Sequence, residues 1–482
     1  MSYRIERDAL GSMELPAEAL YGIQTERARR NFPISGLRPL EPFVVAQVWI
    51  KKAAALTHGD TGRLDSRRVQ AIVSAADEVL AGAHRDQFIV DPYQAGAGTS
   101  HNMNVNEVLA NRANEILGVA RGVYVPVHPN DHVNLAQSTN DTIPTNIRLA
   151  ILRQWPALRM ALDDLTAALH DRGHAFDDIV KAGRTHLQDA MPIRLGQEFH
   201  GYAGTMERAR RRVGDAVAYL HDLGIGGSAV GTGVLVQPEY PARMVTHLRT
   251  ISGIAGLRVG ADRVQLMQSM GDITAFSAAL RGVAIDLSQV MSDIRLMASG
   301  PRTGLDELHL PAVQPGSSMM PGKVNPALPE MVNQVCFQVI GCDTTIAMSA
   351  EHGQLELNVM MPVIAHNVLL ALQLLTNAIV AVTTPCIRGI TANPTMCRYW
   401  VERSAALATA LLPSLGHEAA AALAQRSLRE GVLIRELVQR EGLLSPGAID
   451  RVLDLRRMTE IGIPGAEDLE GSPPLPEAYA PR

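Results

Sequence analysis

The sequence predicts a mostly α-helical protein, and three observations support this prediction. Aromatic residues make up only 4% of the 482 residues, while alanine, leucine and methionine are abundant. This composition favours packed helices over β-sandwiches, which are rich in aromatic and β-branched residues. Apolar residues recur at alternating spacings of three and four over long stretches, which is the helical period. Polar, glycine-rich segments separate those stretches.

Composition also narrows the class of protein. With 46% hydrophobic and 19% charged residues, the chain can bury several cores, and wholesale disorder is not expected. The net charge of −5, the pI of about 6.3 and the lack of a long basic run argue against nucleic acid as a partner. The four cysteines form no CxxC motif and are too few for a disulfide scaffold, so we expect a reduced, cytoplasmic setting.

No segment has the pattern of an export signal or of a clean membrane span. The start of the chain, MSYRIERDALG, is charged and has no apolar stretch. The most apolar segment, residues 368–382, contains Gln373, Thr376 and Asn377 and is short of a full span. We therefore expect it to be a helix that is buried on all sides.

Long helices are predicted in the middle of the chain. The most regular spacing places eight apolar residues on one seam: Ile273, Phe276, Leu280, Val283, Leu287, Val290, Ile294 and Met297. Such a helix would be about 37 Å long. Residues 199–220 repeat at intervals of seven, and residues 158–169 hold four leucines at helical spacing. Helices this long bury their seams only against one another or against other subunits, so we expect a bundle and an oligomer.

The segments between the helices suggest where the domains divide. The longest, residues 300–329, is rich in glycine and proline, and a long ordered loop in a helical protein is a candidate for function. We predict an N-terminal helical domain at 1–140, a central helix-bundle domain at 141–395 and a small C-terminal helical domain at 396–482. The proline-rich residues 471–482 are expected to be frayed.

Reactive groups are most concentrated at residues 316–326, which read GSSMMPGKVNP. Ser317 and Ser318 are followed by Lys323 and Asn325. A lysine can hold a carboxylate and lower the pKa of a nearby hydroxyl, so a desolvated serine here could work as a base. From composition alone, a proline-stiffened connector with no chemistry explains the segment as well.

Three other polar clusters favour a binding site for a small dicarboxylate. They hold hydroxyl and amide donors with one histidine: Thr99, Ser100, Asn102 and Asn104; Ser138, Thr139 and Asn140 just before a helix at Ile143; and Arg184, Thr185 and His186. Each alone is more often a capped turn, although the second could also bind an anion at the helix start.

Metals and nucleotides fit the sequence poorly. His128, His132 and His186 lack the spacing of metal ligands. The glycine-rich segment at 224–233, GIGGSAVGTG, has no βαβ context, so we interpret it as a close approach of backbones at a helix junction. We expect no metal and no cofactor.

Several motifs together resemble the aspartase/fumarase superfamily. GSSMMPGKVNP resembles its GSSxMPxKxNP signature, and further motifs follow in family order along nearly the whole chain. Those most similar to the aspartase branch are YGIQTERARRNFPISG at 21–36, QSTND at 137–141, PEMVNQVCFQVIG at 329–341, GQLELNV at 353–359 and CIRGITAN at 386–393. The resemblance implies a three-domain, mostly helical fold whose long-helix bundles join four subunits into one core, with active sites shared by three subunits.

The resemblance also implies residue roles for the conversion of L-aspartate to fumarate and ammonia. Ser317, on a mobile loop, would take a proton from Cβ and leave an aci-carboxylate. The β-carboxylate would be bound by Thr99, Ser138, Thr139 and Ser318. The α-carboxylate would be bound by Thr185, Lys323 and Asn325. Asn140 and His186 would lie near the amino group. His186 could equally orient the substrate or, with Glu330, act as an acid.

Three departures from the family pattern leave the exact substrate open. Leu135-Ala136 replaces a Lys-Ser pair, Leu235 stands where Asn is usual, and Met361 stands where Glu is common. Each change removes a polar group, but Ser317, Lys323 and the other implied site residues remain. Fumarate hydratase activity, a C–N lyase of substituted aspartates, and a catalytically silent structural protein like the lens crystallins of this superfamily are the alternatives.

Overall fold

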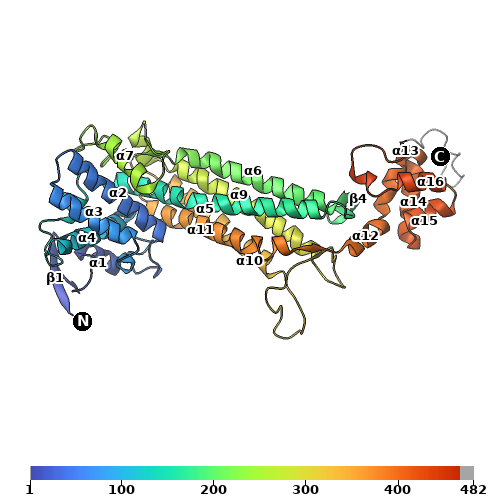
Figure 1. Cartoon of the computed structure of the whole chain (residues 1–482), viewed down its shortest axis with the longest axis horizontal. Helices are drawn as coiled ribbons and strands as arrows, with labels where there is room; N and C mark the ends of the chain where they lie inside the picture. The colour runs from blue at the N-terminus through green and yellow to red at the C-terminus, as the bar shows by residue number, and fades with distance from the viewer. Residues whose placement is uncertain (1, 467–482) are drawn as a thin grey trace. The chain divides into compact units, whose positions relative to one another are not determined.

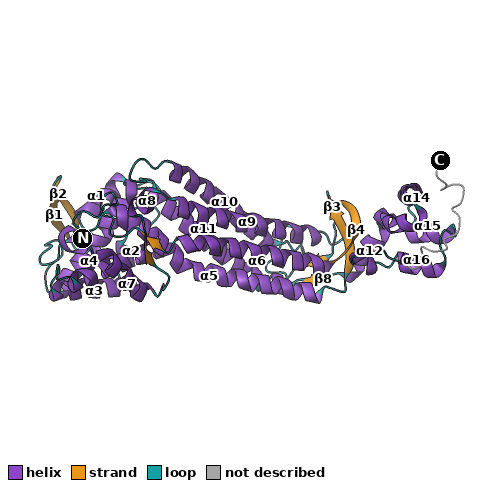
Figure 2. Ribbon diagram, turned by 90° about the horizontal axis from the view of Figure 1, so that it is seen from above, coloured by secondary structure: helices purple, strands orange, loops and turns teal. Residues whose placement is uncertain are grey.

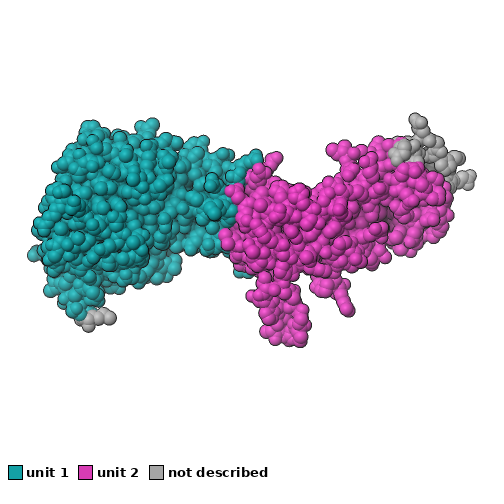
Figure 3. All heavy atoms as spheres, in the orientation of Figure 1, with its two compact units in different colours: residues 1–161, 209–285, 334–377 teal, residues 162–208, 286–333, 378–482 magenta. Residues whose placement is uncertain are grey.

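The computed structural model describes residues 2–466 and divides the chain into two compact units (Figure 3). Unit 1 contains residues 1–161, 209–285 and 334–377, and unit 2 contains residues 162–208, 286–333 and 378–482. The mostly helical fold is confirmed. The predicted fraying of residues 471–482 falls outside the described residues, and the three-domain division stays a prediction.

Unit 1 begins with an antiparallel hairpin and a group of helices (Figure 1). The hairpin is formed by β1 (Tyr3–Asp8) and β2 (Gly11–Pro16), and the helices are α1 (Ile23–Asn31), α2 (Glu41–Asp60), α3 (Ser66–Leu80) and α4 (Thr99–Ile116). Apolar residues at helical spacing on α2, α3 and α4 build a common core that includes Val48, Ile72 and Leu109. The side chain of Asp65 starts α3 by accepting the N–H of Arg68.

Two smaller helices complete this part of unit 1. They are α7 (Tyr240–Ser252) and α8 (Arg263–Gln268), next to a short parallel pair, β5 (Asp222–Leu223) and β6 (Arg258–Val259). Helix α7 packs against α2 and ends at Gly253, whose φ of +73° is the left-handed conformation typical of a glycine after a helix.

Five long helices form the bundle, and each unit contains a part of all five. They are α5 (Thr139–Ala175), α6 (Leu195–Tyr219), α9 (Gly271–Met297), α10 (Ala327–Glu351) and α11 (Met361–Thr383). Within each unit these segments lie side by side in both Figure 1 and Figure 2. The predicted seam of α9 is confirmed, because all eight of its apolar residues are 5% exposed or less.

The prediction for residues 368–382 was only partly right. They lie in α11, but Gln373 and Asn377 are exposed, and Val380 is 59% exposed, so the helix has an open side in the single chain. Among the described residues one segment, Met361–Gly389, is long and apolar enough to cross a membrane. Because 56% of its most apolar window is buried inside the protein, a core helix accounts for it.

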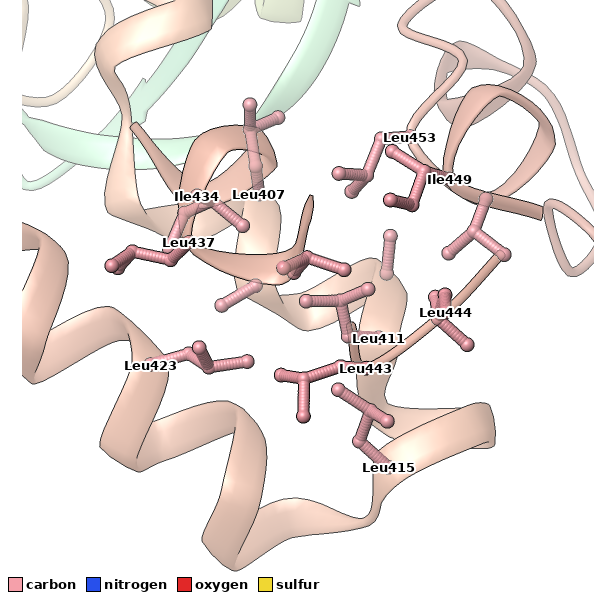
Figure 4. Close-up of a cluster of buried hydrophobic side chains, with 14 of the residues drawn as sticks. Leu407, Leu411, Leu415, Leu423, Ile434, Leu437, Leu443, Leu444, Ile449 and Leu453 are labelled. Atoms are coloured by element: carbon pink, nitrogen blue, oxygen red, sulfur yellow. The ribbon is translucent and has the colours of Figure 1, made fainter. Parts of the chain in front are cut away.

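Unit 2 adds a hairpin and a C-terminal group of short helices to its share of the bundle. The hairpin pairs β3 (Val180–Thr185) with β4 (Gln188–Arg194), and a second short pair joins β7 (Leu308–His309) to β8 (Thr391–Ala392). The short helices are α12 (Pro394–Arg403), α13 (Leu412–Leu415), α14 (His417–Glu430), α15 (Ile434–Arg440) and α16 (Pro446–Val452). Their leucines and isoleucines, including Leu423, Leu437 and Ile449, form a separate core (Figure 4).

The cysteines are buried thiols in both units. Cys336, Cys342, Cys386 and Cys397 are all free, and burial raises the pKa of each thiol. A buried thiol held in its neutral form is a poor nucleophile. The cysteines therefore pack as small apolar groups.

Candidate active site

The predicted cluster Ser138–Thr139–Asn140 forms the start of α5. The helix begins at Thr139, four residues before the predicted Ile143. Ser138 caps it, since its Oγ accepts the N–H of Asn140 at 3.2 Å. In return, Oδ1 of Asp141 accepts the N–H of Ser138 at 3.0 Å. The predicted cap is present, and the predicted anion site would lie at this same helix start.

Buried polar side chains support the start of α5 from within unit 1. Nδ2 of Asn102 lies 3.4 Å from Oγ1 of Thr139 and 3.2 Å from Oδ1 of Asn134. Lys51, which is fully buried, donates to Oδ1 of Asn134 and Oε1 of Gln137, each at 2.9 Å. Burial lowers the pKa of Lys51 to about 7. The segment before α5 is thus fixed by Asn102, which belongs to a predicted cluster, and by Lys51, which no motif indicated.

Thr99 lies close to this helix start. It is the exposed first residue of α4 and follows Gly98, whose φ is +86°. A Cβ on Gly98 would lie 3.1 Å from the side chain of Ile143 on α5. Since Asn102 also reaches Thr139, the structure brings the starts of α4 and α5 together.

The glycine-rich segment 224–233 is a close approach of backbones, as predicted. A Cβ on Gly231 would lie 2.6 Å from Cα of Val264 on α8. The same segment contacts the start of α5: Oδ2 of Asp141 accepts the N–H of Gly226 at 3.0 Å and of Ser228 at 3.1 Å. Asp141 belongs to the QSTND motif, but nothing in the sequence linked it to the glycines.

Thr185 and His186 lie at the turn between β3 and β4, in unit 2. Both are exposed. His186 and Leu187 have φ of +57° and +58°, the conformation of a two-residue type I′ turn, which usually favours glycine or asparagine. Strained turns of this kind concentrate at functional sites. The buried carboxylate of Glu307 holds the hairpin through Arg184 at 2.9 Å and Lys181 at 3.2 Å.

The segment 316–326 is an exposed loop closed by its own hydrogen bonds. At its stem, Gly316 N–H donates to the carbonyl of Lys323 at 2.8 Å, and Nδ2 of Asn325 donates to the carbonyl of Gly316 at 2.6 Å. Oγ of Ser317 accepts the N–H groups of Met319 at 3.1 Å and Met320 at 2.9 Å. Ser318 and Lys323 are exposed.

The predicted site residues are divided between the two units. Unit 1 brings together Thr99, Ser138, Thr139 and Asn140. Unit 2 holds Thr185 and His186 on the hairpin and Ser317, Ser318, Lys323 and Asn325 on or beside the loop. Residues 2–466 contain no group of three or more His, Cys, Asp or Glu arranged to hold a metal ion.

The three departures from the family pattern all lie in unit 1. Leu135 packs against the core of α2, α3 and α4, and its carbonyl lies 2.8 Å from Nε2 of His58. Met361 is fully buried at the start of α11. Leu235 is 79% exposed, and its carbonyl accepts from Arg63. Apolar packing thus accommodates Leu135 and Met361, and nothing in the structure explains Leu235.

Comparison with known proteins matches nearly the whole chain. A family model described as Lyase matches residues 11–341, and one described as Fumarase C C-terminus matches residues 407–460. An aspartate ammonia-lyase of Bacillus subtilis is 47% identical over 97% of this chain and 98% of the relative. A class II fumarate hydratase of Halobacterium salinarum is 46% identical over 97% of this chain and 99% of the relative.

Solved structures give the same fold. A Brucella melitensis protein described as fumarate lyase:delta crystallin, bound to cobalt, has a TM-score of 0.91 at 44% identity, covering 95% of this chain and all 100% of the other. A class II fumarase of Schistosoma mansoni also has a TM-score of 0.91, at 34% identity, covering 95% and 99% of the two chains.

Proposed function

Because the chain belongs to the aspartase/fumarase superfamily of lyases, we propose that it is a C–N lyase that converts L-aspartate reversibly to fumarate and ammonia. The elimination chemistry rests on one observation, the pair of backbone N–H groups that point at the Ser317 hydroxyl. The choice of aspartate rests on the ammonia-lyases among the relatives, which are 42–47% identical.

Ser317 is the proposed base. The N–H groups of Met319 and Met320 stabilise a deprotonated Oγ, so they favour the alkoxide that the step needs. The alkoxide takes a proton from Cβ, and the electron pair left on Cβ spreads into the β-carboxylate as an aci-carboxylate. When the C–N bond breaks, that pair forms the double bond of fumarate. Nitrogen keeps the C–N bonding pair and leaves as ammonia.

The two carboxylates of the substrate are assigned to different groups of donors. Thr99, Ser138, Thr139 and Ser318 are the proposed donors to the β-carboxylate, where negative charge develops, and hydroxyls already held in position stabilise it without reorganising. Thr185, Lys323 and Asn325 are the proposed partners of the α-carboxylate. One N–H of the Asn325 amide is engaged by Gly316, which leaves the other for substrate.

Asn140 and His186 are proposed to lie at the amino group. An α-ammonium carries its proton already and leaves as ammonia with little help from an acid, whereas a hydroxide needs a proton donor. His186 then has an orienting role and no acid is required. This difference makes aspartate the easier substrate for a site without a dedicated acid.

Assembly into a homotetramer is part of the proposal, with each active site shared by three subunits. Val380 of α11 and Phe337 and Met348 of α10 support it, since they are exposed apolar residues on long bundle helices. The free, buried cysteines support a reducing, cytoplasmic setting.

Fumarate hydratase activity is the second candidate, because a class II fumarate hydratase is 46% identical over nearly the full length. It would use His186 and Glu330 as the acid that a hydroxide leaving group needs. Glu330 lies 3.7 Å from the guanidinium of Arg295.

The test is a fumarate-formation assay followed by ultraviolet absorbance. The purified protein is given L-aspartate, L-malate and a panel of substituted aspartates, with heat-denatured protein as the blank. We expect absorbance to rise with aspartate and not with malate. A rise with malate alone would mean that the protein is a fumarate hydratase, seen here in the direction that dehydrates malate to fumarate. A rise only with a substituted aspartate would keep the C–N lyase and change its substrate.

A further inference from the structure

The glycine-rich segment 224–233 has no role in the mechanism above, yet it contacts the start of α5 at two side chains. Both elements belong to unit 1. We call this segment the glycine loop. Its contacts with Asp141 and Asn140 suggest a function beyond the packing that the sequence predicted.

Asp141 anchors the glycine loop. Its carboxylate is fully buried and accepts three backbone N–H groups, from Ser138 through Oδ1 and from Gly226 and Ser228 through Oδ2. Hydrogen bonds to an ionised acceptor are stronger than those between neutral groups. The loop is therefore tied directly to the turn that starts α5.

Asn140, the residue proposed to lie at the amino group of the substrate, also contacts the glycine loop. Its Nδ2 donates to the carbonyl of Ala229 in the glycine loop at 2.8 Å. A backbone carbonyl can only accept, so the amide has to place its nitrogen on the loop side. Oδ1 is consequently presented on the side away from Ala229, as an acceptor.

We propose that the glycine loop is a specificity element, which fixes the Asn140 amide so that its Oδ1 accepts a hydrogen bond from the α-ammonium of the substrate. Asp141 is the positioning residue that holds the loop in place. The inference rests on the proposed function and extends it to residues that do not touch substrate. A cationic donor gains more from a fixed carbonyl acceptor than a neutral hydroxyl does, so the arrangement favours amino over hydroxy acids.

The test distinguishes binding of the substrate's amino group from binding of its two carboxylates. In Gly231→Ala, the added Cβ would lie 2.6 Å from Cα of Val264 and displace the loop. In Asp141→Asn, an amide nitrogen meets the N–H groups of Gly226 and Ser228 and weakens the anchor. Gly253→Ala is the matched control, because Gly253 also has positive φ (+73°) in unit 1 but has open space around it.

For each variant, KM and kcat are measured with aspartate, and the inhibition constant is measured for succinate, which has both carboxylates and no amino group. Loss of a hydrogen bond to a charged group is expected to raise the KM for aspartate about tenfold in both loop variants. The inhibition constant for succinate should stay within about twofold. Gly253→Ala should match the unmodified protein in both, and circular dichroism checks that each variant is folded.

Two results would overturn the inference. Equal weakening of aspartate and succinate would mean that the loop only supports the fold of the site. An unchanged KM for aspartate in a folded variant would mean that the loop does not orient Asn140. If Gly231→Ala does not fold, Asp141→Asn decides between these outcomes. Failure of the unmodified protein to release ammonia from aspartate would instead overturn the proposed function, and this inference with it.

Discussion

The start of α5 in unit 1 and the loop 316–326 in unit 2 carry similar polar residues on different supports. Around Ser138–Asn140 the supports are buried side chains, such as Lys51, Asn102 and Asp141. The loop is closed by its own backbone and by Asn325, and most of its residues are exposed. The first arrangement suits groups that must wait in a fixed geometry, and the second suits a base that must approach the substrate.

This difference has a consequence for mutagenesis. Side chains that support the start of α5 also hold unit 1 together, so their loss affects the fold and the site at once. Residues of the loop carry little of the fold, because exposed positions away from packed features contribute little to stability. Variants near the start of α5 should therefore lower activity and stability together, whereas variants in the loop should lower activity with little loss of stability.

The largest expected effect is the loss of the proposed base. Ser317→Ala should lower kcat by about 10²–10⁴-fold, the usual contribution of a positioned proton acceptor. Its melting temperature should stay within about 1 °C, since the loop is exposed. Steady-state kinetics and a thermal melt on the same preparation measure both quantities. Ser318→Ala, the neighbouring hydroxyl, is the matched control and should retain far more activity. A variant at Ser317 with full turnover would show that another group is the base.

Acid should weaken unit 1 through two buried histidines. Burial lowers the pKa of His58 to about 4 and of His101 to about 3. In the unfolded chain these two histidines take up protons near pH 6.5, before they do in the folded protein, so their contribution to the free energy of unfolding falls as the pH drops below about 6.5. At pH 5 each histidine should cost about 2 kcal/mol.

Urea unfolding at pH 7 and pH 5 measures this loss. His101→Phe keeps the stacking on Phe43, whose ring lies 4.3 Å away, and removes one of the two rings, so the change in the free energy of unfolding between pH 7 and pH 5 should be less destabilising by about 2 kcal/mol. His352→Phe makes the same change at an exposed position in unit 1 and should leave the effect intact. Equal acid sensitivity in the two variants would show that the buried ring is not responsible.

The sequence predicted the long helices better than the buried side-chain contacts that hold the start of α5. The seam of α9 follows from a period that one helix imposes on its own residues. Lys51 and Lys52 are adjacent in the sequence, yet Lys51 is buried against Asn134 and Gln137, whereas Lys52 pairs with Asp77. Those partners lie far along the chain, so no local pattern distinguishes the two lysines.

The roles of the candidate site residues stay predictions, but their surroundings can be compared with the sequence in the same way. Motifs located the hydroxyls, amides and Lys323, but the tertiary structure decided that Asp141 would bind the glycine loop. The part of the α11 prediction that was wrong, burial on all sides, had a local signal against it. Gln373 and Asn377 are four residues apart, which places them on one side of the helix, and that side is exposed.

The smallest expected effect comes from a pair of glycine substitutions that compares the two regions directly. Gly98 at the start of α4 has φ +86°, and Gly322 in the loop has φ +78°, so alanine is strained by about 1 kcal/mol at both. Gly98 also faces Ile143 at 3.1–3.3 Å, whereas no atom lies within 4 Å of a Cβ on Gly322. Gly98→Ala should therefore lower the melting temperature by several degrees. Gly322→Ala should lower the melting temperature less than Gly98→Ala does, because only the backbone strain applies there, and should lower kcat/KM about fivefold. Equal losses of stability in the two variants would mean that both regions are supported in the same way.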